Sequence, residues 1–155
     1  MDKSKVDDKI IISLERAQEH FKTAAHMIYV TFPIIEDKHF LVKIMDELYQ
    51  TLNCLVKSIL YYESKNKKLF VFRNARLNFK VFKKKIAPTK LDFAELTKLE
   101  QIINIRRKHK KSQMEFVRNE KLVILNQDKF EVLTIDKVRE FHDSVGKLFS
   151  YFSQS

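Results

Sequence analysis

The near absence of glycine and proline most constrains this chain of 155 residues, which contains one glycine and two prolines. Glycine supplies the left-handed conformations of tight turns and bulges, and proline supplies rigid turns. A large β-sheet needs many such turns, whereas long helices need few. The scarcity of both residue types therefore predicts a mainly helical protein.

Two long helices are expected in the first part of the chain. Apolar residues recur at spacings of three and four over residues 5–32 and again over residues 38–63, which places them on one face of each helix. We expect Pro33 to end the first helix, because the residue before a proline avoids the helical region. The short connection predicts that the two helices lie antiparallel.

Further elements follow from the same kind of pattern. Helices are expected over residues 69–86, from Thr89 as N-cap to about residue 109, and over residues 135–153 with Thr134 or Asp136 as N-cap. Before the last helix, three short β-type runs separated by turn-type residues predict a small hairpin or a three-strand meander. These runs cover residues 116–118, 121–125 and 130–134.

The predicted fold is therefore mainly α. We expect an antiparallel bundle of four to five helices with a small β-hairpin, at about residues 115–134, before the last helix. At this length and with 45% hydrophobic residues, the chain is expected to bury one core, so residues 1–155 are predicted to form a single helical domain. Gly146 inside the last helix indicates close packing against another backbone or a tolerated defect.

Positive charge is concentrated in the middle third of the chain. Residues 64–114 contain 16 Lys and Arg against 3 Asp and Glu, a net of +13, whereas residues 1–63 hold 8 against 10 and residues 115–155 hold 6 against 7. A field of one sign indicates where an anionic partner binds. The sequence therefore predicts a polyanion-binding surface on residues 64–114.

Two groups of cations make up this surface. The run at residues 106–111 exceeds the one or two cations that offset a helix dipole, although dipole compensation stays open as its role. The cations of the helix expected at 69–86 share a face that has almost no acids at i±4, where like charges destabilise a helix by about 0.2–0.5 kcal/mol per pair. We expect the two groups and the 65–68 loop to merge if their helices are neighbours. The predicted nucleic-acid-binding residues are Lys67, Lys68, Arg73, Arg76, Lys80, Lys83, Lys84, Arg106, Arg107, His109, Lys110 and Lys111.

Four aromatic residues lie among these cations, namely Phe70, Phe72, Phe79 and Phe82. Aromatic rings can stack on unpaired bases. Their helical spacing favours core packing over stacking.

No catalytic, metal or cofactor site is predicted. Cys54 has no second cysteine for a disulfide or a metal knuckle and no clear basic partner to activate it. A single glycine rules out a glycine-rich phosphate loop. Glu36 and His39 form the only Glu-x-x-His motif of the kind that helical di-metal proteins use, and they fall in or beside a loop. The lone cysteine, a polar start unlike a signal peptide and the lack of a membrane-length apolar run predict a cytoplasmic protein.

The layout resembles the HEPN class of small prokaryotic helical domains, and in particular a set of uncharacterised archaeal proteins of this size. The resemblance lies in residues 16–21, 24–33, 48–52, 60–63, 108–112 and 115–118. It implies a helical bundle that is often dimeric and often a partner of RNA. Active HEPN ribonucleases resemble one another in an Arg separated by four to six residues from a His. Arg16 with His20, Arg106 with His109 and Arg139 with His142 do not match this spacing.

These observations favour a non-enzymatic protein that binds RNA or a ribonucleoprotein through residues 64–114. One alternative is a divergent HEPN-type ribonuclease that needs no metal, with Arg106, Arg107 and His109 as a shifted site. The other is a protein-interaction module, antitoxin-like or dimerising, whose basic face docks an acidic protein or whose β-hairpin edge pairs with a second chain. A homodimer is compatible with each, and a membrane partner is not expected.

Overall fold

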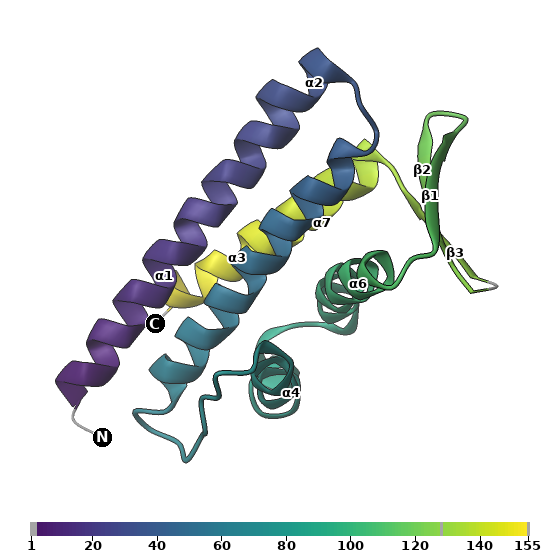
Figure 1. Cartoon of the computed structure of the whole chain (residues 1–155). Helices are drawn as coiled ribbons and strands as arrows, with labels where there is room; N and C mark the ends of the chain where they lie inside the picture. The colour runs from purple at the N-terminus through teal and green to yellow at the C-terminus, as the bar shows by residue number, and fades with distance from the viewer. Residues whose placement is uncertain (1–2, 128, 155) are drawn as a thin grey trace.

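The computed structural model describes residues 3–127 and 129–154 (Figure 1). Within these ranges the chain forms six continuous helical segments and one small sheet of three antiparallel strands. The mainly helical class is confirmed, and so is the small sheet before the last helix. The expected number of four to five helices is too low, because a short helical turn at residues 87–90 stands as a segment of its own.

The first helical segment continues past Pro33. It consists of α1 (Lys3–His26), a π-helical turn η1 (Met27–Thr31) and α2 (Phe32–Ile35). In the wide turn the Phe32 N–H donates to the Met27 carbonyl. Pro33 lies in the first turn of α2, where a missing N–H is tolerated. The expected end at residue 32 is therefore wrong, and the segment ends where Glu36 adopts a left-handed conformation with φ 51°.

The second long helix, α3 (Phe40–Glu63), forms the centre of the molecule. It packs against α1 on one side and against α4, α6 and α7 on others, so it carries buried residues along its whole length. The Ser58 hydroxyl donates to the Ile10 carbonyl of α1 over 3.0 Å, which satisfies a buried polar group at the α1–α3 contact. α1 and α3 lie antiparallel as predicted (Figure 1).

Helix α4 (Ala75–Lys85) begins six residues later than the expected residue 69. Asn74 has extended backbone and its side chain accepts from the N–H groups of Arg76 and Leu77, which makes it the N-cap. The Asn78 amide accepts from the Phe72 N–H at 2.7 Å and donates to the Phe72 carbonyl at 2.9 Å. These bonds hold the segment before α4 in a non-helical path.

Thr89 is not the N-cap of the next long helix. It lies in the short helix α5 (Ala87–Lys90), and its hydroxyl donates to the Ile86 carbonyl. The long helix α6 (Phe93–Lys110) is capped by Asp92, which forms a capping box with Glu95. Glu95, three residues after Asp92, was the sequence signal that α6 starts at this position.

The sheet joins α6 to the last helix. Strands β1 (Met114–Arg118), β2 (Lys121–Asn126) and β3 (Lys129–Leu133) pair in the order of the sequence, so the insert is a three-strand meander and not a single hairpin. Leu122, Ile124 and Leu133 are fully buried on the face that joins the core. The β1–β2 turn places Asn119 and Glu120 at positive φ, as tight hairpin turns require.

The last segment consists of α7 (Ile135–Leu148) and a 3₁₀ extension η2 (Phe149–Gln154). The Thr134 side chain accepts from the Lys137 N–H, so Thr134 is the N-cap of the two predicted candidates. A Cβ on Gly146 would lie 3.1 Å from Cζ of Phe21 in α1. Gly146 therefore allows the close approach of an aromatic side chain. Of the two expectations, packing against another backbone is not what the structure shows.

Candidate nucleic-acid interface

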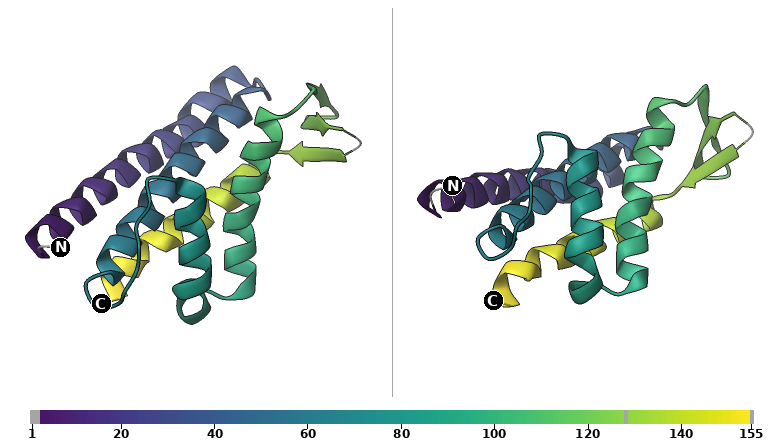
Figure 2. Two further views of the ribbon diagram at one scale, coloured as in Figure 1. Left: turned by 60° about the horizontal axis from the view of Figure 1, so that its bottom comes forward. Right: turned by 90° about the horizontal axis from the view of Figure 1, so that it is seen from below.

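A groove of about 400 Å³ runs between α4 and α6. Both helices pack on α3, whose Tyr49 and Asn53 contribute to the lining between them. Figure 2 shows α4 and α6 side by side on the side of α3 away from α1. The two walls are lined by Ala75, Arg76, Phe79, Lys80 and Lys83 of α4, and by Glu100, Ile103, Asn104, Arg106, Arg107, Lys110 and the following Lys111 of α6.

The two walls run in opposite directions. Lys83 near the end of α4 forms an ion pair of 3.1 Å with Glu100 in the first half of α6. The basic C-terminal end of α6 therefore lies toward the start of α4, near Arg76. Cations of both groups therefore line one groove, but the two basic helix ends do not meet, because an antiparallel pair brings the end of one helix to the beginning of the other.

Seven of the twelve predicted binding residues line this one groove. Glu100 is the one carboxylate among the lining residues. In the part of the chain that the structure describes, Lys83 pairs with Glu100 and Arg106 pairs with an acid of α3, while the other five cations have no ion pair. These five are Arg76, Lys80, Arg107, Lys110 and Lys111. The groove is therefore strongly cationic.

Arg106 is held against the lining of the groove. Its Nε lies 3.3 Å from Oδ1 of Asp46, and its guanidinium carbon lies 4.1 Å from the centre of the Tyr49 ring. This cation–π contact fixes the planar guanidinium over the ring face. Arg106 consequently combines a structural contact to α3 with a place on the groove wall.

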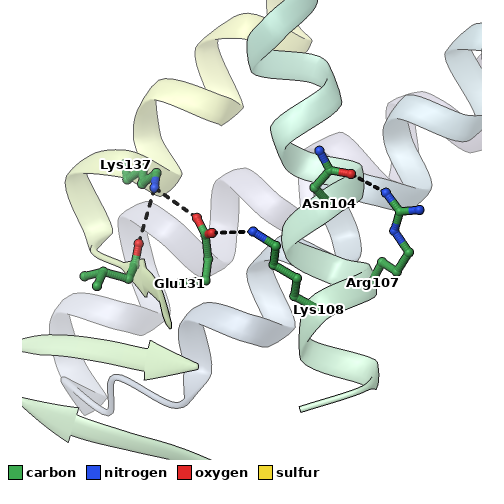
Figure 3. A network of polar contacts seen from close by, with 6 residues as sticks. Asn104, Arg107, Lys108, Glu131 and Lys137 are labelled. Carbon is green, nitrogen blue, oxygen red and sulfur yellow. Dashed lines mark hydrogen bonds and ion pairs between the residues drawn. The ribbon is translucent and has the colours of Figure 1, made fainter. Parts of the chain in front are cut away.

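The other side of the α6 terminus faces the sheet and α7 (Figure 3). Nζ of Lys108 lies 3.0 Å from one oxygen of Glu131, and Nζ of Lys137 lies 3.3 Å from the other. Nε2 of His109 lies 2.9 Å from Glu115, whose second oxygen lies 3.2 Å from Nδ1 of His39. Arg107, one position from Lys108, instead contacts the Asn104 side-chain oxygen on the groove side.

Five predicted residues do not line the groove. They are Lys67, Lys68, Arg73, Lys84 and His109. Lys67 pairs with Glu63 at 3.4 Å in the loop after α3. Arg73 lies in the non-helical segment before α4, and Lys84 follows Lys83 on a different side of the helix. The 65–68 loop is thus not part of the groove, and the basic run of α6 divides between two faces because successive helical residues point about 100° apart.

The aromatic residues also divide. Phe79 and Phe82 are buried on α4, so core packing is confirmed for both. Phe70 is 79% exposed, and its ring lies 6.1 Å from that of the exposed Phe72. Core packing is wrong for this pair, because residues 69–74 are not helical and the spacing argument does not apply to them.

Tyr49, Asn53, Ile103 and Asn104 are groove residues that the sequence did not identify. They carry no charge, so the basic pattern did not mark them. Tyr49 and Asn53 are four residues apart on α3, and Ile103 and Asn104 are partly buried on α6. The spacing of four between Tyr49 and Asn53 indicated that they share one face of the helix, but it did not indicate that this face lines a groove and is not covered by another element.

Other kinds of site find no support in residues 3–127 and 129–154. No three His, Cys, Asp or Glu side chains gather there in a way that could hold a metal ion. None of the described helices combines the length and the apolar character that a membrane crossing needs. Burial raises the pKa of the half-buried Cys54 thiol, which disfavours the nucleophilic thiolate.

No protein-family model, no curated protein and no solved structure matches this chain. The resemblance to the HEPN class therefore stays a prediction. The function has to be argued from the groove and the surfaces themselves.

Proposed function

We propose that this chain binds RNA, without cleaving it, through the groove between α4 and α6. The observation that carries the proposal is the gathering of seven cations on two walls with one carboxylate among the lining residues. Phosphates bound there release condensed counterions, which supplies affinity without reading sequence. RNA alone or within a ribonucleoprotein is the polyanion proposed.

Two observations support binding over cleavage. Nε2 of His109 lies 2.9 Å from Glu115 on the sheet side, whereas Arg106 is held against Tyr49 and Asp46 on the groove side. A shifted nuclease site would need the two side chains to reach one phosphate. The Arg and His spacing of active HEPN ribonucleases is also not matched.

The test is fluorescence anisotropy of a labelled structured RNA across a salt series. The variant to use is Arg76→Glu with Lys80→Glu, because both side chains are exposed, have no ion pair in the described structure and leave α4 well formed. We expect affinity to fall about tenfold or more, and the slope of log affinity against log salt to flatten by about two.

The matched control is Lys5→Glu with Lys22→Glu on α1, which makes the same change in net charge. Both lysines are exposed, and α1 lies on the other side of α3 from the groove (Figure 1). An equal loss in both variants would mean that net charge, and not the groove, binds the RNA. RNA shortened on a gel after the titration, with shortening lost in His109→Ala, would favour the ribonuclease alternative.

A further inference from the structure

The sheet has an apolar face that the helices do not cover. Leu122, Ile124 and Leu133 point into the core, so alternation places their neighbours on the opposite face. Cross-strand pairing arranges these neighbours in two rows of three. One row is Met114, Leu125 and Phe130, and the other is Phe116, Val123 and Val132.

This outer face is accessible and contiguous. Phe130 is 64% exposed, Met114 56% and Val132 37%, while the other three side chains are partly buried beside them. Figures 1 and 2 show the sheet at the periphery, beyond the end of α6. Alternating strands normally turn polar residues to water, so a face with six apolar residues marks an interaction surface.

Two basic residues extend the outer face of the described sheet. Glu115 and Glu131 lie beside His and Lys side chains on the core side, and Glu120 in the first turn lies 2.8 Å from Lys38. Arg118 and Lys121, which pair directly across β1 and β2 in the same outward register as Phe116 and Val123, have no acid partner in the described residues. Like charges placed opposite each other destabilise a sheet, and an anionic partner would remove that cost.

We propose that the outer face of the sheet is the docking surface for an acidic protein segment that presents apolar side chains. The apolar rows supply the buried contact. Arg118 and Lys121, which have no acid partner among the residues that the structure describes, supply charge complementarity. This surface is separate from the groove, so the inference does not depend on RNA binding.

Two other occupants fit the face less well. A second copy would bring a chain of net charge +10 against another of the same charge. RNA would meet the cations, but its sugars and phosphates would leave Met114, Val123 and Val132 in contact with polar groups. An acidic segment with apolar residues satisfies both the charge and the apolar rows.

The experiment selects peptides from a random linear library displayed on phage, with the full chain as bait. We expect the selected sequences to be enriched in Asp and Glu alternating with apolar residues. A synthetic peptide of the leading sequence is then titrated against the wild type and against Phe130→Thr with Val132→Thr. This variant keeps the charge and the strand propensity, so its unfolding should be unchanged while peptide affinity falls about tenfold or more.

Controls separate the occupants. The groove variant Arg76→Glu with Lys80→Glu should bind the peptide as the wild type does. The proposal is overturned if no peptide is selected, if acids are not enriched, or if Phe130→Thr with Val132→Thr binds the peptide equally well. Self-association in sedimentation that this variant abolishes would assign the face to a second copy, and a matching loss of RNA affinity would assign it to RNA.

Discussion

The two sides of the α6 C-terminus carry residues of the same basic run, but these residues have different neighbours. Arg107, Lys110 and Lys111 line the groove without an acid partner in the described chain. Lys108 and His109 lie within 3.0 Å of Glu131 and Glu115. A cation next to a carboxylate helps hold the sheet in place, whereas a cation without one remains available for a ligand. A basic run is therefore informative only when its neutralising partners are known.

The strongest test of this difference reverses charge on both groove walls. The variant Arg76→Glu, Lys80→Glu, Arg107→Glu and Lys110→Glu should lose RNA affinity about a hundredfold, or about 2.7 kcal/mol, because four phosphate contacts become repulsive. Anisotropy measures the affinity and circular dichroism checks the helices. If the loss per reversed charge equals that of the α1 control variant, net charge binds the RNA, and the groove cations without an acid partner have no special role.

A smaller effect is expected from the sheet side. Glu131→Gln removes the charge that lies between Lys108 and Lys137 while keeping the side-chain volume. The free energy of unfolding should fall by about 1 kcal/mol, since the carboxylate is mostly buried but its partners are partly solvated. Urea unfolding measures this change, with the exposed Glu140→Gln as the matched control. Unchanged stability would show that the Glu131 contacts do not hold the sheet.

Adjacent alanine substitutions separate the two sides at a finer scale. Lys108→Ala should lower the free energy of unfolding by about 0.5 kcal/mol and leave RNA affinity unchanged. Arg107→Ala should leave the free energy of unfolding unchanged and lower RNA affinity, because its side chain has no ion pair in the described structure. Both replacements bring the same gain in helix propensity, so it cancels. Identical profiles for the two variants in unfolding and anisotropy experiments would contradict the division of α6.

The smallest effect concerns the turn of the sheet. A hydrogen bond from Lys38 lowers the pKa of Glu120 below its usual 4.5. A lowered folded-state pKa contributes stability above the ordinary pKa, and this contribution is lost as the pH falls through the folded value. Between about pH 5 and about pH 3, the free energy of unfolding of the wild type should therefore fall slightly more than that of Glu120→Gln. Thermal unfolding over that range measures it, and parallel curves would show that the pair is too solvated to matter.

The sequence predicted most of the fold because apolar periodicity and polar breaks follow the helices and strands closely. The start of α4 was misplaced because Phe70 and Phe72 extend the apolar pattern. The hydrogen bonds between the Asn78 side chain and the Phe72 backbone, which keep this segment out of the helix, leave no mark in that pattern. The end of the first segment was misplaced because a π turn accommodates Pro33. Such details depend on contacts and not on periodicity.

The candidate site was predictable only in part. The cations were visible in the sequence, but which of them share a groove depends on α4 and α6 being antiparallel neighbours on α3. Lys108 and His109 look identical to Arg107 and Lys110 as a run of basic letters. Their partners Glu131 and Glu115 come from strands later in the chain, so no local pattern separates them.

Because glycine is scarce, other residues occupy strained left-handed positions in the turns, and this strain lowers the stability of the fold. Glu36 and Gln127 have φ of 51° and 57°, and the left-handed conformation costs a residue with a Cβ about 1–2 kcal/mol. The single glycine instead lies in a helix, opposite Phe21. The substitutions Glu36→Gly and Gln127→Gly are therefore the first to try for a more thermostable form, since they change neither the groove nor the outer face of the sheet.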